Sequence, residues 1–310
     1  MDGYAEVVAA NTMKALRNIE YHDVAPLGIV EKVLPLAYRV PDEKRLAWAR
    51  PIAAQIQNNL PNGISQVYAR EAIILHERQT TALKLQAIRI GDLTISTLPN
   101  EVYAITGLKL KAQSPLGSHF NIELANGSEG YIPPPEQHAF GGYTTWPART
   151  AGLEPQAEPK EVETLLGALE EVTGKKRRPM DSQHGPFAKA VLDAQPLAYW
   201  RLDEAEGRIA GNAVTGGVSA NVFDRAAWYL PGVGSGTGYG AGEALKPSAL
   251  SGDKQINRSL HLAGGRIEAE PKLTDHASIA LWLWLGHQSG ASERSGNVIE
   301  GLGTKLVAHQ

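Results

Sequence analysis

The spacing of apolar residues predicts a mixture of helices and strands in the first half of the chain. Helical spacing occurs in residues 4–20, 65–78 and 160–173. Two β-rich runs, 81–90 and 93–98, flank Gly91 and Asp92, which is the pattern of a hairpin with a tight turn. Shorter elements are expected between them: an extended run over 33–40, a helix over 100–111 and a strand over 119–127.

One further helix is predicted after Asp42, whose side chain is a suitable N-cap. Pro51 lies inside this pattern. Because proline removes a helical hydrogen bond, we expect it to kink or divide the helix. Helices mixed with hairpins indicate an α+β, layered domain over residues 1–174.

The pattern changes from Ala198 onward, where short β-runs alternate with glycine-rich segments. The runs cover 198–204, 259–270 and 278–286. In the last run both alternating faces are apolar, which predicts a strand packed on both sides. The glycine-dense segment 232–242 lacks G-x-G-x-x-G spacing, so a flexible loop is the favoured interpretation. These features predict a second, all-β domain over 196–310.

The two predicted domains are joined by residues 175–195, which open with the basic run Lys175 to Arg178. Basic residues at the end of a helix complement its dipole, and Pro179 stops the helix. The run is either a solvated linker or a patch that binds anions or directs targeting. A solvated linker is the favoured interpretation.

Composition excludes several classes of function. The chain has 310 residues, 43% hydrophobic and 20% charged, with a formal net charge of −3. This balance argues against a protein held on nucleic acid by phosphate contacts. Absence of cysteine removes disulfides, thiolate zinc sites and cysteine nucleophiles. No apolar run is long enough to span a membrane.

The first residues do not have the composition of a signal peptide, because an acid comes early and no apolar core follows. They resemble the middle of a helix without an N-cap. We therefore expect the chain to be part of a longer polypeptide.

Candidate chemistry is concentrated in the glycine- and proline-rich stretch from Pro99 to Arg149. Loops on a rigid scaffold often carry binding and catalytic side chains. The polar and aromatic candidates in the stretch are Glu101, His119, Asn126, Glu129, Tyr131, His138, Tyr143 and Arg149. The H-E-x-x-H, G-x-S-x-G and P-loop patterns are absent from the sequence.

Each of these candidates also has an ordinary structural interpretation. Glu101 is either a first-turn acid favoured by a helix dipole or a metal-ligand carboxylate. Tyr131 is either a half-buried ring with a satisfied hydroxyl or a site residue. His119 and His138 are typical of surface or structural histidines. From the residues alone, the prediction is a polar site of unspecified chemistry.

Two segments of this stretch resemble the later part of the neutral/alkaline (non-lysosomal) ceramidase family. They are LPNEVYAITGLKLK at 98–111 and ELANGSEGYIPPPEQHAFGGYTTW at 123–146. The resemblance extends over about 1–174 and includes the hairpin before Pro99 and the helix at 160–173.

This resemblance implies a zinc-dependent amidase that cleaves the N-acyl bond of ceramide, or of a related lipid amide, into sphingoid base and fatty acid. In the family, two histidines, a glutamate and a tyrosine hold the zinc, with a nearby serine implicated in the attack. Glu101 matches the glutamate ligand and Tyr131 the tyrosine, which also has a catalytic role. A secreted, periplasmic or cell-surface location is implied as well.

The chain departs from the family pattern before Pro99, where no H-x-H or serine nucleophile segment occurs. His22 and His76 stand in contexts that do not match the family. Two of four ligands cannot make a tight zinc site. We therefore expect this polypeptide by itself to be inactive.

Residues from about Pro196 resemble LamG-like, concanavalin-type jelly-roll modules, in PLAYWRLDE at 196–204, SLHLAGGRIEAE at 259–270 and DHASIALWLWL at 275–285. Such modules bind carbohydrate or protein, or act as spacers. The number of predicted strands is too small for a full sandwich, which suggests a truncated module with poor order or aggregation near 286–310.

Asp203 and Asp224 are candidate calcium or sugar ligands in the second domain, although surface acids are the favoured interpretation.

A second functional hypothesis follows from the differences between this chain and the family pattern. It is a non-catalytic binding or adhesion protein whose first domain is a degenerate ceramidase-like scaffold.

Overall fold

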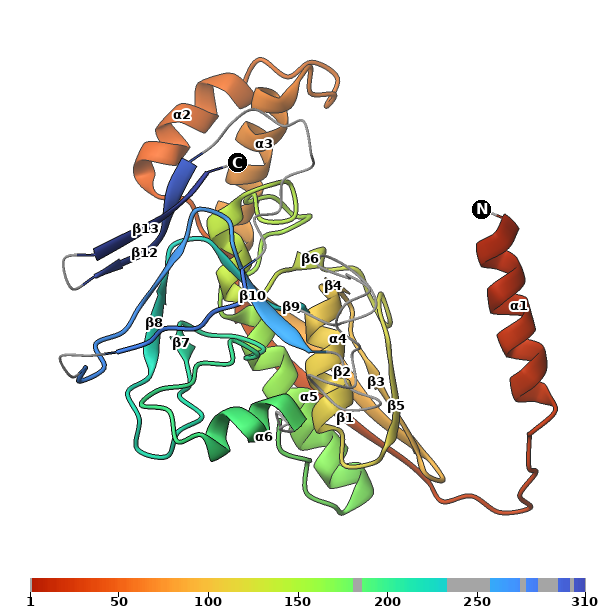
Figure 1. Ribbon diagram of the computed structural model, residues 1–310. Helices are drawn as coiled ribbons and strands as arrows, with labels where there is room; N and C mark the ends of the chain where they lie inside the picture. Colours follow the sequence, from red (N-terminus) through yellow and green to blue (C-terminus); the bar gives the residue numbers. More distant parts are fainter. Residues whose placement is uncertain are drawn as a thin grey trace. The chain divides into compact units, whose positions relative to one another are not determined.

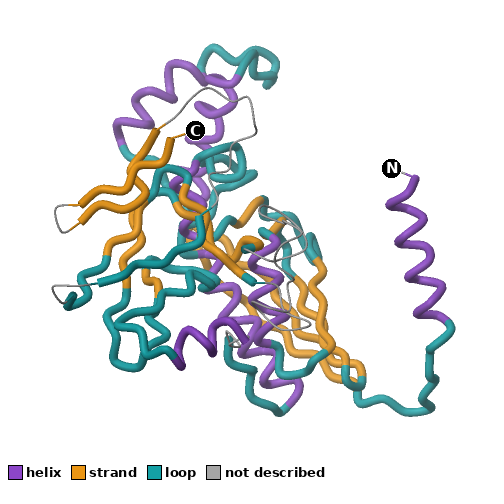
Figure 2. Tube along the Cα trace, in the orientation of Figure 1, coloured by secondary structure: helices purple, strands orange, loops and turns teal. Residues whose placement is uncertain are grey.

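A computed structural model describes residues 2–180, 186–232, 257–273, 277–283, 295–301 and 304–309. The chain divides into two compact units, Met1–Ser182 with Ala205–Gly207, and Gln183–Glu204 with Arg208–Gln310. The first unit contains both helices and strands (Figure 2), which is compatible with the predicted α+β class. None of the described helices combines the length and apolar character needed to cross a bilayer.

The first unit contains five α-helices, six strands and one short 3-10 helix among its described residues (Figure 1). The helices are α1 (Asp2–Leu16), α2 (Glu43–Ala53), α3 (Ile64–Arg78), α4 (Ala104–Gln113), η1 (Pro135–Phe140) and α5 (Ala157–Thr173). The strands are β1 (Leu27–Ala37), β2 (Thr80–Ile90), β3 (Leu93–Thr97), β4 (Glu101–Val102), β5 (Ser118–Ile122) and β6 (Tyr131–Ile132).

A four-stranded sheet in the order β1-β2-β3-β5 forms the centre of this unit. The predicted hairpin is confirmed: β2 and β3 pair antiparallel around Gly91, whose φ of 59° is easily adopted by glycine. Strand β5 pairs parallel to β3, with α4 as the connection between them. A parallel pair requires such a crossover, and the buried residues of this helix are Thr106, Lys109 and Leu110.

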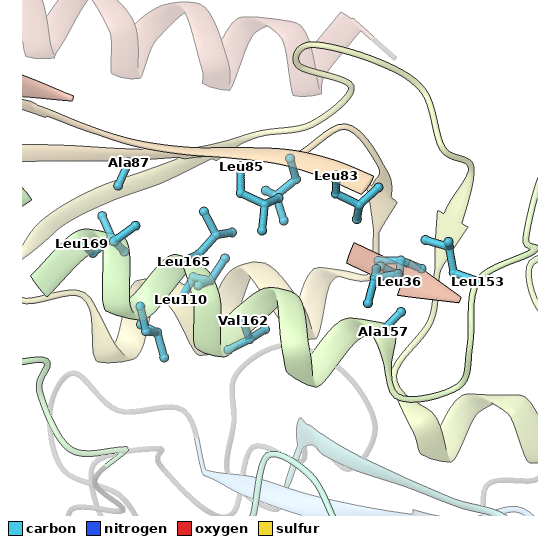
Figure 3. Close-up of a cluster of buried hydrophobic side chains, with 14 of the residues drawn as sticks. Leu36, Leu83, Leu85, Ala87, Leu110, Leu153, Ala157, Val162, Leu165 and Leu169 are labelled. Carbon is cyan, nitrogen blue, oxygen red and sulfur yellow. The ribbon is translucent and has the colours of Figure 1, made fainter. Parts of the chain in front are cut away.

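The inner face of the sheet is covered by α5, and this contact forms the main hydrophobic core. Figure 3 shows Leu83, Leu85 and Ala87 of β2 directed toward Leu165 and Leu169 of α5. All five side chains are at most 1% exposed. The alternation of side-chain direction along β2 therefore decides which residues of the strand pack against α5.

The outer face of the same sheet carries a row of apolar side chains that runs across all four strands. Ile29 is opposite Ile88, which is opposite Ile95, which in turn is opposite Phe120. Ile29 and Phe120 remain 61% and 42% exposed. The outer face therefore carries apolar side chains that are partly exposed, whereas the inner face of β2 forms part of the main core.

Most predicted elements of the first unit are present, but three boundaries differ. The helix predicted over 100–111 begins only at Ala104, because Glu101 and Val102 form β4. The strand predicted over 119–127 ends at Ile122, because Leu124 and Asn126 have positive φ angles. The extended run predicted over 33–40 begins earlier, at Leu27.

The remaining local predictions concern helix ends. The Asp42 side chain accepts a hydrogen bond from the Arg45 backbone at 2.7 Å, which confirms the N-cap of α2. Helix α2 runs through Pro51 and ends two residues later, at Ala53. Gly174 ends α5 in the left-handed conformation, with φ of 66°.

Residues of the basic run after α5 hold two helices in place. Arg177 makes ion pairs with Glu163 and Glu170 of α5, at 2.7 and 3.1 Å. Arg178 donates to the carbonyls of Lys111 and Ser114 at the end of α4. Arg178 thus satisfies carbonyl acceptors at the end of α4, and Arg177 pairs with carboxylates of α5. Lys175, Lys176 and Arg178 remain exposed, and the interpretation of the run as a solvated linker stays a prediction.

The second unit is described only in part. Its elements are α6 (Pro186–Asp193), β7 (Ile209–Ala210), β8 (Ala220–Phe223), β9 (Ala226–Pro231), β10 (Arg258–Leu262), β11 (Arg266–Glu268), β12 (Ser295–Gly301) and β13 (Thr304–His309). They form a three-stranded sheet, β11-β8-β7, and two antiparallel pairs, β10-β9 and β12-β13. The small core contains Ala210, Ala220, Val222, Ala226 and Trp228.

Two strand predictions in this unit were wrong. Residues 198–204 contain no strand beyond a bridge from Trp200 to Asn212, and Leu202 has a φ of 58°. Residues 277–283 are not a strand, and Ile279 and Trp282 are 64% and 60% exposed instead of packed on both sides. Residues 284–286 and most of the predicted glycine loop 232–242 lie outside the described residues.

Where poor order was expected near 286–310, strands β12 and β13 form an antiparallel pair. The candidate acids Asp203 and Asp224 pair with Arg201 and Arg266. Asp224 is an exposed acid, with 59% of its side chain accessible, whereas only 13% of the Asp203 side chain is accessible, so the surface interpretation was wrong for Asp203. The jelly-roll architecture stays a prediction, because the described strands form three separate small sheets.

The interface between α4 and α5 contains a buried ion pair. Lys109 Nζ lies 3.1 Å from Glu158 Oε1, with side chains 3% and 0% exposed, and Thr106 donates to the same carboxylate. Burial opposes the charge on Lys109, but the carboxylates of Glu158 and Glu206 together outweigh it and raise the pKa of the ammonium group.

We predict that Lys109→Met lowers the free energy of unfolding by about 3–5 kcal/mol, because the substitution leaves a buried carboxylate without its cation. Urea denaturation measures the change. The control is Lys32→Met, whose pair with Glu171 is 2.7 Å long but has side chains 41% and 56% exposed. It should change stability by about 1 kcal/mol or less. Equal losses in the two variants would contradict the prediction.

Glu161 on α5 provides a second test. Both of its carboxyl oxygens are buried with no hydrogen-bond partner among the described residues. Burial first, and then the carboxylates of Glu158 and Glu123, raise its pKa from 4.5 to about 8. Between these two pH values the folded state keeps the Glu161 proton, whereas the unfolded state loses it. The free energy of unfolding should therefore fall as the pH rises from about 4.5 to about 8.

We predict that Glu161→Gln removes this fall, so that the variant is more stable than the native protein at pH 8, by about 1–4 kcal/mol. Urea denaturation at half-unit pH steps measures it. Glu171→Gln is the control on the same helix, because Glu171 is 56% exposed. A native-like pH dependence in Glu161→Gln would refute the assignment.

Candidate functional site

Glu101 and Tyr131 lie side by side on the short strands β4 and β6, which are adjacent in Figure 1. The two strands pair parallel with Glu101 opposite Tyr131. Glu101 N donates to Gly130 O at 3.1 Å, and Glu129 N donates to Pro99 O at 2.7 Å. Thirty positions separate the two residues in the sequence, and backbone pairing brings them together.

The Tyr131 hydroxyl takes part in a small hydrogen-bonded cluster. The Tyr143 hydroxyl donates to it at 3.4 Å, and the two rings meet edge to face with centroids 5.2 Å apart. The hydrogen bond with Tyr143, followed by that with Glu101, raises the pKa of Tyr131 above 10.0. The phenol is therefore protonated at neutral pH and acts as a hydrogen-bond donor.

Tyr143 is the residue of this cluster that the sequence prediction did not assign a role. It lies in the loop between η1 and Arg149, which sequence patterns alone do not place. The sequence feature that could have identified Tyr143 is an aromatic residue in a glycine-rich loop, where a ring is expected to be exposed. The side chain is indeed 59% exposed.

His119, a sequence candidate, is part of a buried polar network on the inner face of the sheet. It is 7% exposed, with Nδ1 at 3.0 Å from Thr94 Oγ1 and Nε2 at 3.0 Å from Asn121 Oδ1. Burial lowers its pKa below 6.5. These contacts agree with a structural histidine, and its ring nitrogens are occupied by protein partners.

His138 on η1 is paired with a cation. Its Nδ1 lies 3.4 Å from Arg39 Nη1, and Arg39 also donates to Ala151 O. Burial, and then the charge of Arg39, lower the pKa of His138 to about 4. The imidazole is therefore neutral at pH 7 and accepts a hydrogen bond from the guanidinium group.

The other candidates of the stretch make structural contacts. Glu129 accepts a hydrogen bond from the Tyr38 hydroxyl at 2.7 Å. Asn126 donates to Gln86 at 3.0 Å on the exposed side of the sheet. Arg149 makes a bidentate ion pair with Glu71. The structure thus brings Glu101, Tyr131 and Tyr143 together and places the remaining candidates in supporting contacts.

A zinc site of the kind implied by the sequence resemblance needs four ligands. Glu101 and Tyr131 offer two oxygen donors. Across the described ranges, no group of three or more histidines, aspartates or glutamates is placed to hold a metal ion. The residues present therefore do not form a complete zinc site.

Residues 149–153, which we name the spine segment, hold β6 and β1 on its two sides. On one side, Tyr131 N donates to Thr150 O at 2.7 Å. On the other side, Arg39 N donates to Gly152 O at 2.7 Å, and Leu153 bridges to Tyr38. The spine segment therefore connects the candidate site to the main sheet.

Close packing at Gly130 makes this arrangement possible. Its φ is 76°, and a Cβ atom added there would lie 2.4 Å from Thr150 O. Glycine is required on both grounds, because an L side chain is strained at this φ and would overlap the backbone.

Comparisons with known proteins give a limited result. No protein-family model and no curated protein matches the chain. Among solved structures, it is similar to a neutral ceramidase from Pseudomonas aeruginosa, with a TM-score of 0.32 and 14% identity over 64% of this chain and 38% of that one. It is also similar to a ceramidase complexed with C2, with a TM-score of 0.27 and 19% identity over 33% of this chain and 16% of that one.

This chain spans less than two fifths of the length of either solved structure. Both TM-scores are below 0.5, so these likenesses do not establish its fold or its activity. The function proposed below therefore depends on the residues of the candidate site.

We predict that Gly130→Ala destabilises the first unit and exposes the Tyr131 amide to exchange, because the new Cβ displaces Thr150. Gly142→Ala is the matched control: its φ is 95°, and nothing lies within 4 Å of the added Cβ. The positive φ alone costs about 1–3 kcal/mol in either variant. Hydrogen exchange should show loss of Tyr131 protection in Gly130→Ala only, and equal protection in both would contradict the role of Thr150.

Proposed function

We propose that this chain carries the carboxylate and phenol part of a zinc-dependent amidohydrolase site of the neutral ceramidase type. The observation that carries the proposal is the in-register pairing of Glu101 with Tyr131, the two residues that match the glutamate and tyrosine ligands in the sequence resemblance. The reaction is hydrolysis of the N-acyl amide of ceramide, or of a related lipid amide, to a sphingoid base and a fatty acid.

The chain's own residues suggest a division of roles. In this chain, Tyr131 donates its single phenol proton to Glu101. Tyr143 fixes the orientation of that phenol through the hydroxyl contact at 3.4 Å. In the complete site, Glu101 and Tyr131 would be two of the four zinc ligands, with two histidines as the others. The ion held there would polarise the amide carbonyl, on which negative charge develops during attack.

The remaining features of the proposal follow from the same resemblance. Residues 1–174 form the ceramidase-like segment, 175–195 the linker and 196–310 a partial LamG-like module that binds carbohydrate or protein. The protein acts outside the cytoplasm, as a secreted, periplasmic or cell-surface hydrolase. These assignments are supported by the quoted sequence segments.

The alternative function is a binding or adhesion protein built on a degenerate ceramidase-like scaffold. Two observations favour it: His119 and His138 are engaged by protein groups, and no metal-binding group of three acids or histidines is present in the described parts of the chain. In this alternative the Glu101 and Tyr131 pair only stabilises the β4 and β6 contact.

We predict that the purified chain by itself binds less than 0.1 zinc ion per molecule and releases no fatty acid from a short-chain N-acyl sphingosine, because a two-ligand site holds zinc weakly. Elemental analysis and chromatography of the products measure both quantities. Stoichiometric zinc with fatty acid release would overturn the assignment of this chain as an incomplete site.

The reading frame upstream of Met1 distinguishes the two functions. An H-x-H pattern and a serine nucleophile segment there support the hydrolase, and their absence supports the binding protein. In a joined polypeptide, Glu101→Gln and Tyr131→Phe should each lower kcat/KM at least 100-fold, as loss of a metal ligand requires. Tyr21→Phe is the control, because Tyr21 is 93% exposed. Unchanged activity in Glu101→Gln would reject the proposed site.

A further inference from the structure

We propose that Glu71 is a positioning residue for the candidate site, and that α3 sets the geometry of Tyr131 and Tyr143 through two contacts with the segment 146–150. This inference rests on the proposed function, in which Tyr131 belongs to the site and Tyr143 fixes its orientation. Glu71 itself lies on α3, away in sequence from every residue that the resemblance assigns.

The first contact is a three-point clamp on Arg149. Glu71 Oε2 accepts hydrogen bonds from Arg149 N at 3.0 Å and from Arg149 Nε at 2.8 Å. Glu71 Oε1 accepts a third from Arg149 Nη2 at 2.7 Å. The Glu71 side chain is only 5% exposed. A carboxylate that binds both the backbone and the guanidinium fork of one residue fixes its position and its orientation.

The clamp acts on Tyr131 through the next residue of the spine segment. Thr150 follows Arg149 directly, and its carbonyl accepts the hydrogen bond from Tyr131 N at 2.7 Å. The same carbonyl limits Gly130, because an added Cβ would lie 2.4 Å from it. A displacement of Arg149 therefore moves the backbone acceptor that holds Tyr131 opposite Glu101.

The second contact acts on the loop that carries Tyr143. The Tyr68 ring, one turn before Glu71 on α3, meets the Trp146 ring edge to face at 5.6 Å. Trp146 lies three residues after Tyr143, and Trp146 N donates to Gly142 O at 3.1 Å. Helix α3 thus contacts the stretch from Tyr143 to Arg149 at Trp146 and at Arg149. Tyr143, whose hydroxyl contacts Tyr131, begins this stretch.

A purely stabilising role for Glu71 makes a different prediction from a positioning role. If Glu71 only contributes to stability, its loss lowers the unfolding midpoint and leaves the environment of Tyr131 unchanged. If Glu71 positions Tyr131, its loss weakens the hydrogen bond from Tyr131 N to Thr150 O and the edge-to-face contact between the Tyr131 and Tyr143 rings. These two contacts of Tyr131 are therefore the readout that separates the two roles.

The experiment is NMR spectroscopy of the full chain with 13C- and 15N-labelled tyrosine. Tyr131→Phe identifies the Tyr131 signals among the 10 tyrosines. In the native protein, the Tyr131 and Tyr143 rings should show a nuclear Overhauser effect, and the Tyr131 amide should be protected from hydrogen exchange. In Glu71→Gln, which nearly preserves shape but removes the charge, the effect between the two rings should be lost and the Tyr131 amide should lose its protection.

Glu154→Gln is the matched control. Glu154 also accepts a hydrogen bond from a backbone amide, Ala37 N at 3.0 Å, and pairs with a cation, Lys160 at 2.6 Å. Its contacts are with the end of β1 and not with β6. This variant should leave both Tyr131 contacts unchanged, even where it lowers the unfolding midpoint as much as Glu71→Gln does.

Arg149→Lys tests the same inference without removing the carboxylate. Lysine keeps the charge but loses the two-point fork, so both Tyr131 contacts should weaken by an intermediate amount. If Glu71→Gln does not fold, this variant alone decides. Unchanged Tyr131 contacts in the folded variants overturn the positioning role, whatever the outcome of the zinc and hydrolysis measurements.

Discussion

The backbone of the spine segment, residues 149–153, is the constraint on which the candidate site depends. Peptide groups that leave solvent need hydrogen-bond partners, and this segment supplies them to β6 on one side and to the end of β1 on the other. Gly130 and Gly152 allow the close approach, because a Cβ at either position would meet backbone oxygen within 3.0 Å. The two-stranded sheet of β4 and β6 is thereby joined to the four-stranded sheet.

The interior behind this segment is unusually polar for a small helix-on-sheet layer. Lys109 with Glu158 and the network around His119 lie within or next to the contact of α4 with α5 and the sheet. Buried ion pairs contribute less to net stability than apolar packing does, but breaking one is costly. The apolar contact of β2 with α5 therefore provides most of the stability, and the polar groups specify how α4 sits against it.

The chemistry of the candidate pair follows from its surroundings. Beside a carboxylate and a second hydroxyl, the Tyr131 phenol holds its proton more tightly than a free tyrosine does. A phenolate ligand would require a nearby cation to offset the charge of Glu101. Together with Tyr143, the pair forms a hydrogen-bonded unit. Among the described residues, no group of three or more histidines, aspartates or glutamates is placed to hold a metal ion.

The sequence alone determined those elements whose signals are local. Two β-rich runs around Gly91 located the hairpin of β2 and β3, helical spacing located α5, and Asp42 marked the start of α2. It also singled out Glu101 and Tyr131, through residues that resemble a known family. Local signals failed in the second unit, where residues 277–283 have a strand-like pattern but remain exposed and irregular.

Only the tertiary structure decided how the candidate site is built. A pattern cannot show that Glu101 belongs to a two-residue strand, because β4 exists only through its pairing with β6. Nor can it show that Glu71 holds Arg149 from 78 positions away, or that Tyr143 meets Tyr131. The physical reason is the same in each case: these contacts join segments distant in the chain, and they form only when the backbone hydrogen bonds of the spine segment fix those segments side by side.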